Sequence, residues 1–484
     1  MAINRRVTSE SLRRCRVEAK LTTLRTEIEK NLSRSGHNLA SFAKISGLNR
    51  GSLSAILHGN PPKPISLGQM DAMTRAFGFP EGWLYPLYVE ECFSEDRISR
   101  RRVEPFLVRC AEIGKQQCID EVLSRIMEYP RPLDIVYTVA ERLFCSGKTQ
   151  ESVVFYRLIV ENEPDSYSER LAISQYRIFK SLQSTPDVDM EQKLRAVIRF
   201  EPFRGLLPED MQLDGLLKLA KVCFALHRWK DVEKYADELR ALAHGIYREE
   251  LRRSKGKRVE AFQAERPLVV YYGHGYLLKA SALTKRGEYE QAKKYTAGYA
   301  DLGWFELLDD EGRSAVDSFR LFAVANGFTL EILMGNTSVL PAYIAFLAEH
   351  PGEILSGMVI ILESANRFGF SADAVLSRFS REMLRFEQFQ DPINVDRVYR
   401  LYYQIAMYYI SRKQYSKGID YIIQCLRLTV RLNSGKDFIN CVTLFELNRD
   451  ASSDTQQTAY RELLREVRQR EEVTDHESQR FGVI

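Results

Sequence analysis

Apolar residues recur every three or four positions along almost the whole chain, beginning with Leu21, Leu24, Ile28 and Leu32. This spacing places apolar side chains on one face of a helix, whereas the strict alternation typical of half-buried strands is hard to find. The 16 prolines and 27 glycines fall mostly between the periodic segments. The pattern therefore predicts an all-α protein whose helices are joined by short turns.

The stretch FAKISGLNRGSLSAILHG, residues 42–59, carries the most specific local pattern. Gly47 can adopt the left-handed conformation that ends a helix at a tight turn. Leu48 fills the corner, and Asn49 has a side chain that can cap the next helix. The stretch therefore predicts a helix, a sharp turn and a second helix.

The predicted second helix has two different faces. Its apolar face consists of Leu53, Ile56 and Leu57. The opposite face is polar and basic, with Arg50, Ser54 and His58 spaced by four. A helix with such a face can enter the major groove of DNA. Further on, Ser66 followed by Gln69 predicts a capping box at the start of another helix.

The charge is unevenly distributed. Residues 1–64 contain twelve Lys or Arg and four Glu, an excess of eight positive charges, although the whole chain carries a net charge of only +4. A basic head on a mildly acidic body is typical of a nucleic-acid-binding module attached to another domain. A basic tail that only interacts with solvent is the alternative interpretation.

The order of residues over about 21–90 resembles the Cro/repressor type of helix-turn-helix. In that family the second helix of the motif reads base edges, and the preceding helix contacts phosphate. The resemblance implies that Arg50, Ser54 and His58 contact the groove and that Asn49 and Ser52 contact DNA from the helix end. Leu39 stands where the family often has glutamine, so phosphate contacts are expected from His37, Asn38 or Ser41. A hairpin that only supports the body is the alternative.

Four later segments resemble the tetratricopeptide repeat, with small residues at helix crossings and aromatic residues filling gaps. The clearest runs from Tyr276 to Tyr299, and the others lie around Gly147, Trp229 and Tyr409. Such hairpins stack into a right-handed helical superhelix with a concave groove suited to an extended peptide or a partner helix. The candidate peptide contacts are Arg400, Tyr403, Gln404 and Met407, together with Arg170, Gln175 and Arg177. A solvated polar face is the alternative for each of them.

Together these features predict five segments: a basic arm at 1–20, a helix-turn-helix domain at 21–93, a linker at 94–103, a tetratricopeptide-like repeat domain at 104–450, and a C-terminal helix and tail at 451–484. A Cro-type head expected to read paired half-sites predicts a homodimer. The dimer is expected to be held by the body or by an apolar stripe within 454–473, formed by Tyr460, Leu463, Leu464 and Val467.

The combination of head and body resembles the peptide-pheromone receptors of Gram-positive bacteria and their phages, which include the Rap, NprR, PlcR, PrgX and arbitrium receptors. The resemblance implies a cytoplasmic, dimeric, quorum-sensing transcription regulator. Its partners would be a double-stranded DNA operator and a short signalling peptide that alters DNA binding. The alternative is a Rap-like adaptor that binds and inhibits a partner protein through its repeats.

Signals for an enzyme, a cofactor or a metal are weak. Ser146-Gly147-Lys148-Thr149 resembles the end of a phosphate-binding loop, but Arg142 stands where that loop needs its first glycine. Gly273-His274-Gly275 is interpreted as a helix crossing. The histidines and cysteines form no metal-binding motif, and the eight scattered cysteines are expected to be reduced thiols. The sequence therefore predicts no enzyme, no cofactor, no bound metal and no membrane span.

Overall fold

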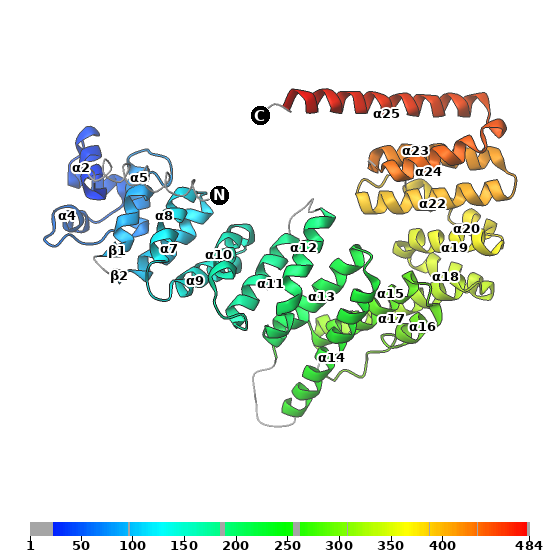
Figure 1. Cartoon of the computed structure of the whole chain (residues 1–484), viewed down its shortest axis with the longest axis horizontal. Coiled ribbons are helices and arrows are strands. Elements are labelled where there is room, and N and C mark those ends of the chain that lie inside the picture. Colours follow the sequence, from blue (N-terminus) through cyan, green and yellow to red (C-terminus); the bar gives the residue numbers. More distant parts are fainter. Residues whose placement is uncertain are drawn as a thin grey trace, which may run out of the picture. The chain divides into compact units, whose positions relative to one another are not determined.

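The computed structural model describes residues 23–94, 97–183, 189–254, 262–306, 308–386, 388–432 and 434–481 (Figure 1). The described chain is helical apart from one short antiparallel pair of strands, which confirms the predicted all-helical class. It divides into two compact units, 1–222 and 223–484, and each is described by itself below. The expected basic arm at 1–20 lies outside the described residues.

The elements of the first unit follow in chain order: α2 (Leu24–Arg34), α3 (Leu39–Ser46), α4 (Arg50–His58), α5 (Leu67–Ala76), α6 (Tyr85–Tyr88), the 3-10 helix η2 (Val89–Cys92), β1 (Phe93–Ser94), β2 (Arg97–Ile98), α7 (Arg100–Glu112), α8 (Gln116–Ile126), α9 (Pro132–Cys145), α10 (Thr149–Asn162), α11 (Glu169–Gln183), α12 (Met190–Phe200), η3 (Glu201–Leu206) and most of α13 (Glu209–Ala225), whose last residues, 223–225, belong to the second unit. Consecutive helices such as α9 and α10 pack against each other as hairpins.

The turn and cap signals near the start of the chain have the expected geometry. Gly47 ends α3 with a φ of 70°, in the left-handed region. The Asn49 side chain accepts hydrogen bonds from the backbone N–H groups of Gly51 and Ser52 at the start of α4. Both hydrogen bonds of the predicted capping box between Ser66 and Gln69 are present at the start of α5.

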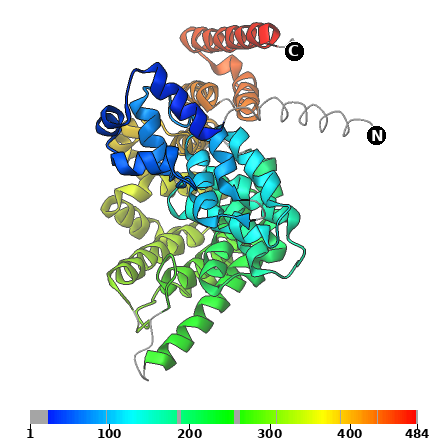
Figure 2. The same cartoon turned by 90° about the vertical axis from the view of Figure 1, so that its left-hand side faces the viewer.

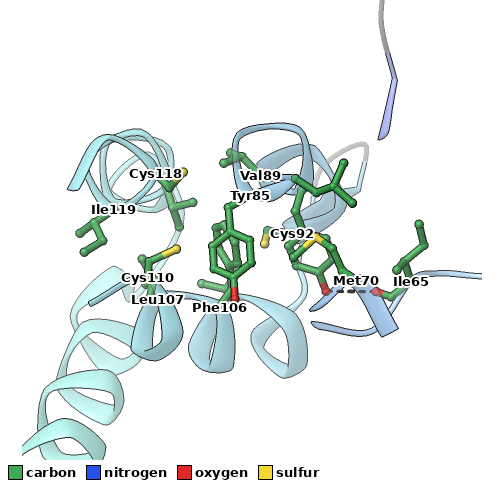
Figure 3. Packing of buried hydrophobic residues seen from close by; sticks show 14 of the residues in the cluster. Ile65, Met70, Tyr85, Val89, Cys92, Phe106, Leu107, Cys110, Cys118 and Ile119 are labelled. Carbon is green, nitrogen blue, oxygen red and sulfur yellow. Dashed lines mark hydrogen bonds between the residues drawn. The ribbon is translucent and has the colours of Figure 1, made fainter. Parts of the chain in front are cut away.

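The segment 94–103 differs from the expected linker. It contains the end of β1, all of β2 and the first turn of α7. Tyr85 and Tyr88 lie 5.2 and 5.1 Å, between ring centroids, from Phe106 of α7, and Val103 is fully buried. Figure 3 labels Tyr85 and Phe106 among the residues of this core. One hydrophobic core runs from α2 to α10 without a break at this segment. The linker prediction was wrong because the charged residues of the segment obscure a helical apolar spacing that starts at Val103.

The elements of the second unit follow in chain order: α14 (Trp229–Ser254), α15 (Leu268–Lys285), α16 (Tyr289–Ala297), α17 (Asp310–Leu333), η4 (Thr337–Val339), α18 (Leu340–Glu349), η5 (Pro351–Glu353), α19 (Ile354–Phe368), α20 (Asp373–Arg378), α21 (Ser380–Phe386), α22 (Pro392–Ser411), α23 (Tyr415–Leu432), α24 (Gly435–Glu446), η6 (Arg449–Ala451) and α25 (Asp454–Phe481). Helices α22 and α23 form a long hairpin, and so do α14 and α15. In Figure 2, the long green helix at the lower edge of the view is α14.

The segment Gly273-His274-Gly275 lies inside α15 at a helix crossing, as expected. A Cβ atom at Gly273 would stand 2.4 Å from the Phe319 ring, and one at Gly275 would stand 2.8 Å from the backbone oxygen of Ala236. Real Cβ atoms do not approach so closely. The two glycines therefore allow α15 to pack closely against α17 and α14.

The start of α25 packs against the end of the helical array rather than presenting a free apolar stripe. Tyr460 stacks on Phe445 of α24 with ring centroids 3.8 Å apart, and its hydroxyl donates to Glu446 at 2.8 Å. Tyr460 and Leu463 are buried within their own chain. Three of the four residues of the stripe expected to hold a dimer, Tyr460, Leu463 and Leu464, therefore pack on the core of their own chain, because a terminal hairpin must cover its own apolar face.

No single helix among the described residues has both the length and the apolar composition to cross a membrane. One pair, Thr337–Glu349 with Pro351–Phe368, passes that test only when its two parts are taken together, although the chain bends by 117° between them.

Candidate nucleic-acid and ligand sites

Helix α4 presents part of the predicted groove-contacting face. Its inward side is formed by Leu53, Ile56 and Leu57, all of which are buried. On the opposite side Arg50 is exposed and Ser54 is half-buried. Within the described part of the chain, neither side chain has a hydrogen bond or ion pair. Arg50 and Ser54 are therefore available to an external partner.

The other three residues predicted to contact DNA have partners within the chain. The Nδ1 atom of His58 lies 3.4 Å from Glu29 of α2. Gln69 of α5 donates to the hydroxyl of Ser52 at 3.3 Å. Asn49 caps α4, as predicted from its position. Glu29 is distant in sequence, so no local pattern predicted that a carboxylate would stand beside His58.

The start of α3 is capped in the same way as α4. The Asn38 side chain accepts from the N–H groups of Ala40 and Ser41, and the Ser41 hydroxyl donates back to the Asn38 carbonyl. The Ser41 hydroxyl hydrogen is therefore already used, whereas no hydrogen bond within the described part of the chain uses the NH2 group of Asn38, which could still donate to phosphate. Lys44 in the last turn of α3, which the sequence analysis did not select, is exposed.

The four candidate peptide contacts on α22 are not equivalent. Arg400 and Met407 are exposed and Tyr403 is half-buried. The pKa of Tyr403 is raised, mainly because the side chain is partly buried. The side-chain oxygen of Gln404, however, accepts a hydrogen bond of 2.8 Å from Asn366 of α19. Gln404 therefore connects two helices, in contrast to its expected role of pairing with a peptide backbone.

The arginines predicted on α11 also have internal roles. Arg170 forms ion pairs with Glu163 at 2.6 Å and Asp134 at 2.7 Å. Arg177 donates two hydrogen bonds to Glu141 of α9, at 3.2 and 3.0 Å. Burial alone would lower the pKa of Arg177, but these bonds outweigh it and the net change is upward.

These arginine contacts correct the expectation that Arg170 and Arg177 are free to hold a peptide. A partly buried guanidinium is stable only with carboxylate partners. Asp134 and Glu141 of α9 and Glu163, directly after α10, supply them. Gln175, the third residue of this set, is half-buried without a hydrogen bond to another described residue. These residues lie in the first unit, whereas the α22 set lies in the second.

The second unit contains a cavity of about 450 Å³ between α20, α21, α22 and α23. Its lining consists of Asp373, Leu376, Ser377, Ser380, Met383, Leu384, Tyr402, Tyr409, Tyr421 and Gln424. The rings of Tyr402 and Tyr421 meet edge to face at 5.4 Å, and Tyr409 and Tyr421 are stacked at 6.1 Å. The sequence analysis predicted a repeat-like segment around Tyr409 but did not predict this cavity.

The chemistry of this cavity is mixed. Aromatic faces and aliphatic side chains line one part, and hydroxyl, amide and carboxylate groups line another. Burial is the first cause that raises the pKa of Tyr409, so its hydroxyl is a neutral donor at physiological pH. The volume of this cavity falls within the range of clefts that bind small ligands.

The described residues contain no group of three or more His, Cys, Asp or Glu side chains that could hold a metal ion. Ser146-Gly147-Lys148-Thr149 forms the turn between α9 and α10, where Gly147 has a φ of 81°. No strand precedes this turn in the described part of the first unit except the β1–β2 pair.

Comparisons with known proteins identify no relative in sequence. No family model matches the chain, and no curated protein matches it. Among solved structures it is similar to a "Circular tandem repeat protein with novel repeat topology and enhanced subunit contact surfaces", at 12% identity over 92% of this chain and 90% of that chain, with a TM-score of 0.14. That TM-score is too low to carry an argument about fold or function.

Proposed function

We propose that this protein is a DNA-binding transcriptional regulator of the quorum-sensing type. Its first part would be a Cro/repressor-type helix-turn-helix domain. Its body would be a tetratricopeptide-like superhelix that binds a short signalling peptide, and occupancy would alter DNA binding. The observation that carries the proposal is the α3–turn–α4 unit, in which Gly47 makes the turn, Asn49 caps α4 and Arg50 stays exposed.

The proposed DNA contacts follow from the faces of α4. A major groove about 12 Å wide admits an α-helix. With Leu53 and Ile56 turned to the core, Arg50 and Ser54 are left to meet base edges. A guanidinium can donate two hydrogen bonds to guanine, which gives Arg50 the largest share of specificity. The exposed Lys44 would add a salt-sensitive attraction to phosphate.

The proposed peptide contacts lie in the second unit. The exposed Arg400 and Met407 and the half-buried Tyr403 are the proposed contacts on α22, and the tyrosine-lined cavity offers a second position. A homodimer in the cytoplasm, bound to a double-stranded operator with two half-sites about 34–36 Å apart, would be the functional unit. A ligand that binds two conformations unequally would then shift DNA affinity.

A second candidate function is that of an adaptor that inhibits a partner protein. The observation in its favour is that Ser52 and His58 have partners inside the head, which leaves a small groove-contacting face. In that case the head would dock onto a protein and would show no preference for any DNA sequence.

Selection from a random duplex library with the purified full chain tests the first proposal. We expect one enriched sequence with two related half-sites. Arg50→Ala should weaken binding to that sequence by about 1–3 kcal/mol, as for a side chain that contacts a base. Arg75→Ala, which removes another exposed arginine of the head, is the matched control and should have little effect. Failure to enrich any sequence would favour the adaptor.

A further inference from the structure

A single side chain, Arg25 of α2, contacts three other parts of the segment 23–94. Its Nε donates to the backbone oxygen of Ile56 in the last turn of α4 at 3.0 Å. One terminal nitrogen donates to the backbone oxygen of Lys63 at 3.2 Å. The other forms an ion pair of 2.5 Å with Glu91 of η2. The planar guanidinium is suited to this role because its donors point in fixed directions.

The loop between α4 and α5 is held on both sides by these contacts and their neighbours. The N–H of Lys63 donates to the backbone oxygen of Ala55 at 2.8 Å. Tyr88 of α6 donates from its buried hydroxyl to the backbone oxygen of Ile65 at 3.1 Å. Arg25 therefore completes a set of hydrogen bonds that fixes where α4 ends and how the chain leaves it.

The same contacts continue to α7. Arg102 of α7 donates to the backbone oxygen of Glu91 at 2.6 Å. Glu91 thus accepts one hydrogen bond from Arg25 through its side-chain carboxylate and one from Arg102 through its backbone oxygen. The side chains of Arg25 and Glu91 are 23% and 14% exposed, so their ion pair is shielded from solvent more than a surface pair. Loss of either partner would leave the other charge partly buried without compensation.

We propose that Arg25 is a positioning residue for α4, and that the chain of contacts from Arg102 through Glu91 and Arg25 makes the position of α4 depend on α7. The inference rests on the proposed function, because α4 is the helix assigned to the DNA groove. Arg25 itself need not contact DNA. If α7 moved within the first unit, these contacts would move the end of α4 and the loop at 59–66 with it.

Three variants and one control test this inference in the full chain. Arg25→Ala removes all three contacts, and Arg25→Lys keeps a positive charge near Glu91 without two fixed donors to the carbonyl groups. Glu91→Gln removes only the charge of the partner. Arg125→Ala is the control, because it removes an ion pair of 2.9 Å with the neighbouring Glu90 and no contact to α4.

The first measurement is hydrogen exchange at the N–H of Lys63. We expect exchange to rise about tenfold or more in Arg25→Ala and Arg25→Lys, and to be unchanged in Arg125→Ala. The second is affinity for the duplex enriched by the parent chain. We expect a loss of about tenfold in Arg25→Lys with a melting temperature close to that of the parent, a combination that general destabilisation would not produce.

The outcomes separate this inference from the proposed function. If the parent enriches no duplex, the proposed function fails, and the exchange of Lys63 still decides whether Arg25 holds the loop. If the parent binds a duplex and Arg25→Lys binds it equally well, the positioning role is wrong. If Arg25→Ala fails to fold, Arg25→Lys and Glu91→Gln decide, and unchanged exchange in both would overturn the inference.

Discussion

Asn366 of α19 donates from one amide nitrogen to both oxygens of Gln404 on α22, at 2.8 Å to the side chain and 2.9 Å to the backbone. The backbone oxygen of a helical residue normally accepts only within its own helix, so this side chain joins two neighbouring helices. A residue expected to bind a peptide thus has a structural partner inside the second unit.

The Asn366–Gln404 contact should contribute to stability. We expect Asn366→Ala and Gln404→Ala each to lower the free energy of unfolding by about 1 kcal/mol. The double variant should lose less than the sum, because each single change already breaks the shared hydrogen bond. Urea unfolding of the four proteins measures this coupling. Strict additivity would show that the two side chains do not interact in solution.

Arg177 should also be a structural residue. Its guanidinium lies between Glu141 and the ring of Phe144, 4.1 Å from the ring centroid, and its side chain is only 12% exposed. We expect Arg177→Met to destabilise the chain by about 2 kcal/mol, because Glu141 would lose its cation while partly buried. Gln175→Ala on the same helix should change stability by less than about 0.5 kcal/mol. Equal effects of the two substitutions on denaturant unfolding would contradict this assignment.

Two helical glycines should respond oppositely to alanine. Gly273→Ala would force a methyl group against the Phe319 ring, so we expect a loss of about 1–3 kcal/mol. Apart from the backbone of its own helix and its chain neighbours, no atom lies within 4 Å of a Cβ added at Gly245 in α14, so Gly245→Ala should stabilise by about 0.5–1 kcal/mol through higher helix propensity. Thermal unfolding followed by circular dichroism compares the two. A stable Gly273→Ala protein would refute the close crossing of α15 and α17.

The docking of α25 should weaken in acid. Two hydrogen bonds hold the pKa of Glu446 below its usual value: the larger effect comes from Arg449 and the smaller from Tyr460. A carboxyl whose folded-state pKa is lowered contributes stability above its unfolded pKa and loses that contribution as the pH falls through the folded value. We therefore expect hydrogen exchange near Tyr460 to rise below about pH 4.

Glu446→Gln provides the control for this pH dependence. The variant cannot titrate at position 446, so it should have weaker α25 docking at neutral pH and a smaller change between neutral pH and acid. An acid response of the same size in both proteins would assign the effect to other carboxyl groups.

The regular spacing of apolar residues determined the helices and several of their ends. Gly47, Asn49 and the Ser66–Gln69 capping box were predictable because each acts on backbone groups within three or four positions of itself. The inward face of α4 was predictable for the same reason, since a helix repeats its faces every 3.6 residues.

The tertiary structure alone decided which polar side chains remain available. Arg177 and Glu141 are 36 positions apart, Asn366 and Gln404 are 38 apart, and Arg25 and Glu91 are 66 apart. No local spacing reveals such partners, so the sequence indicated which residues have suitable chemistry but not which of them the chain uses itself. The contact between Tyr85 and Phe106, which continues the core across the expected linker, could not be predicted for the same reason. Apolar burial depends on which faces meet in space and not on their distance along the chain.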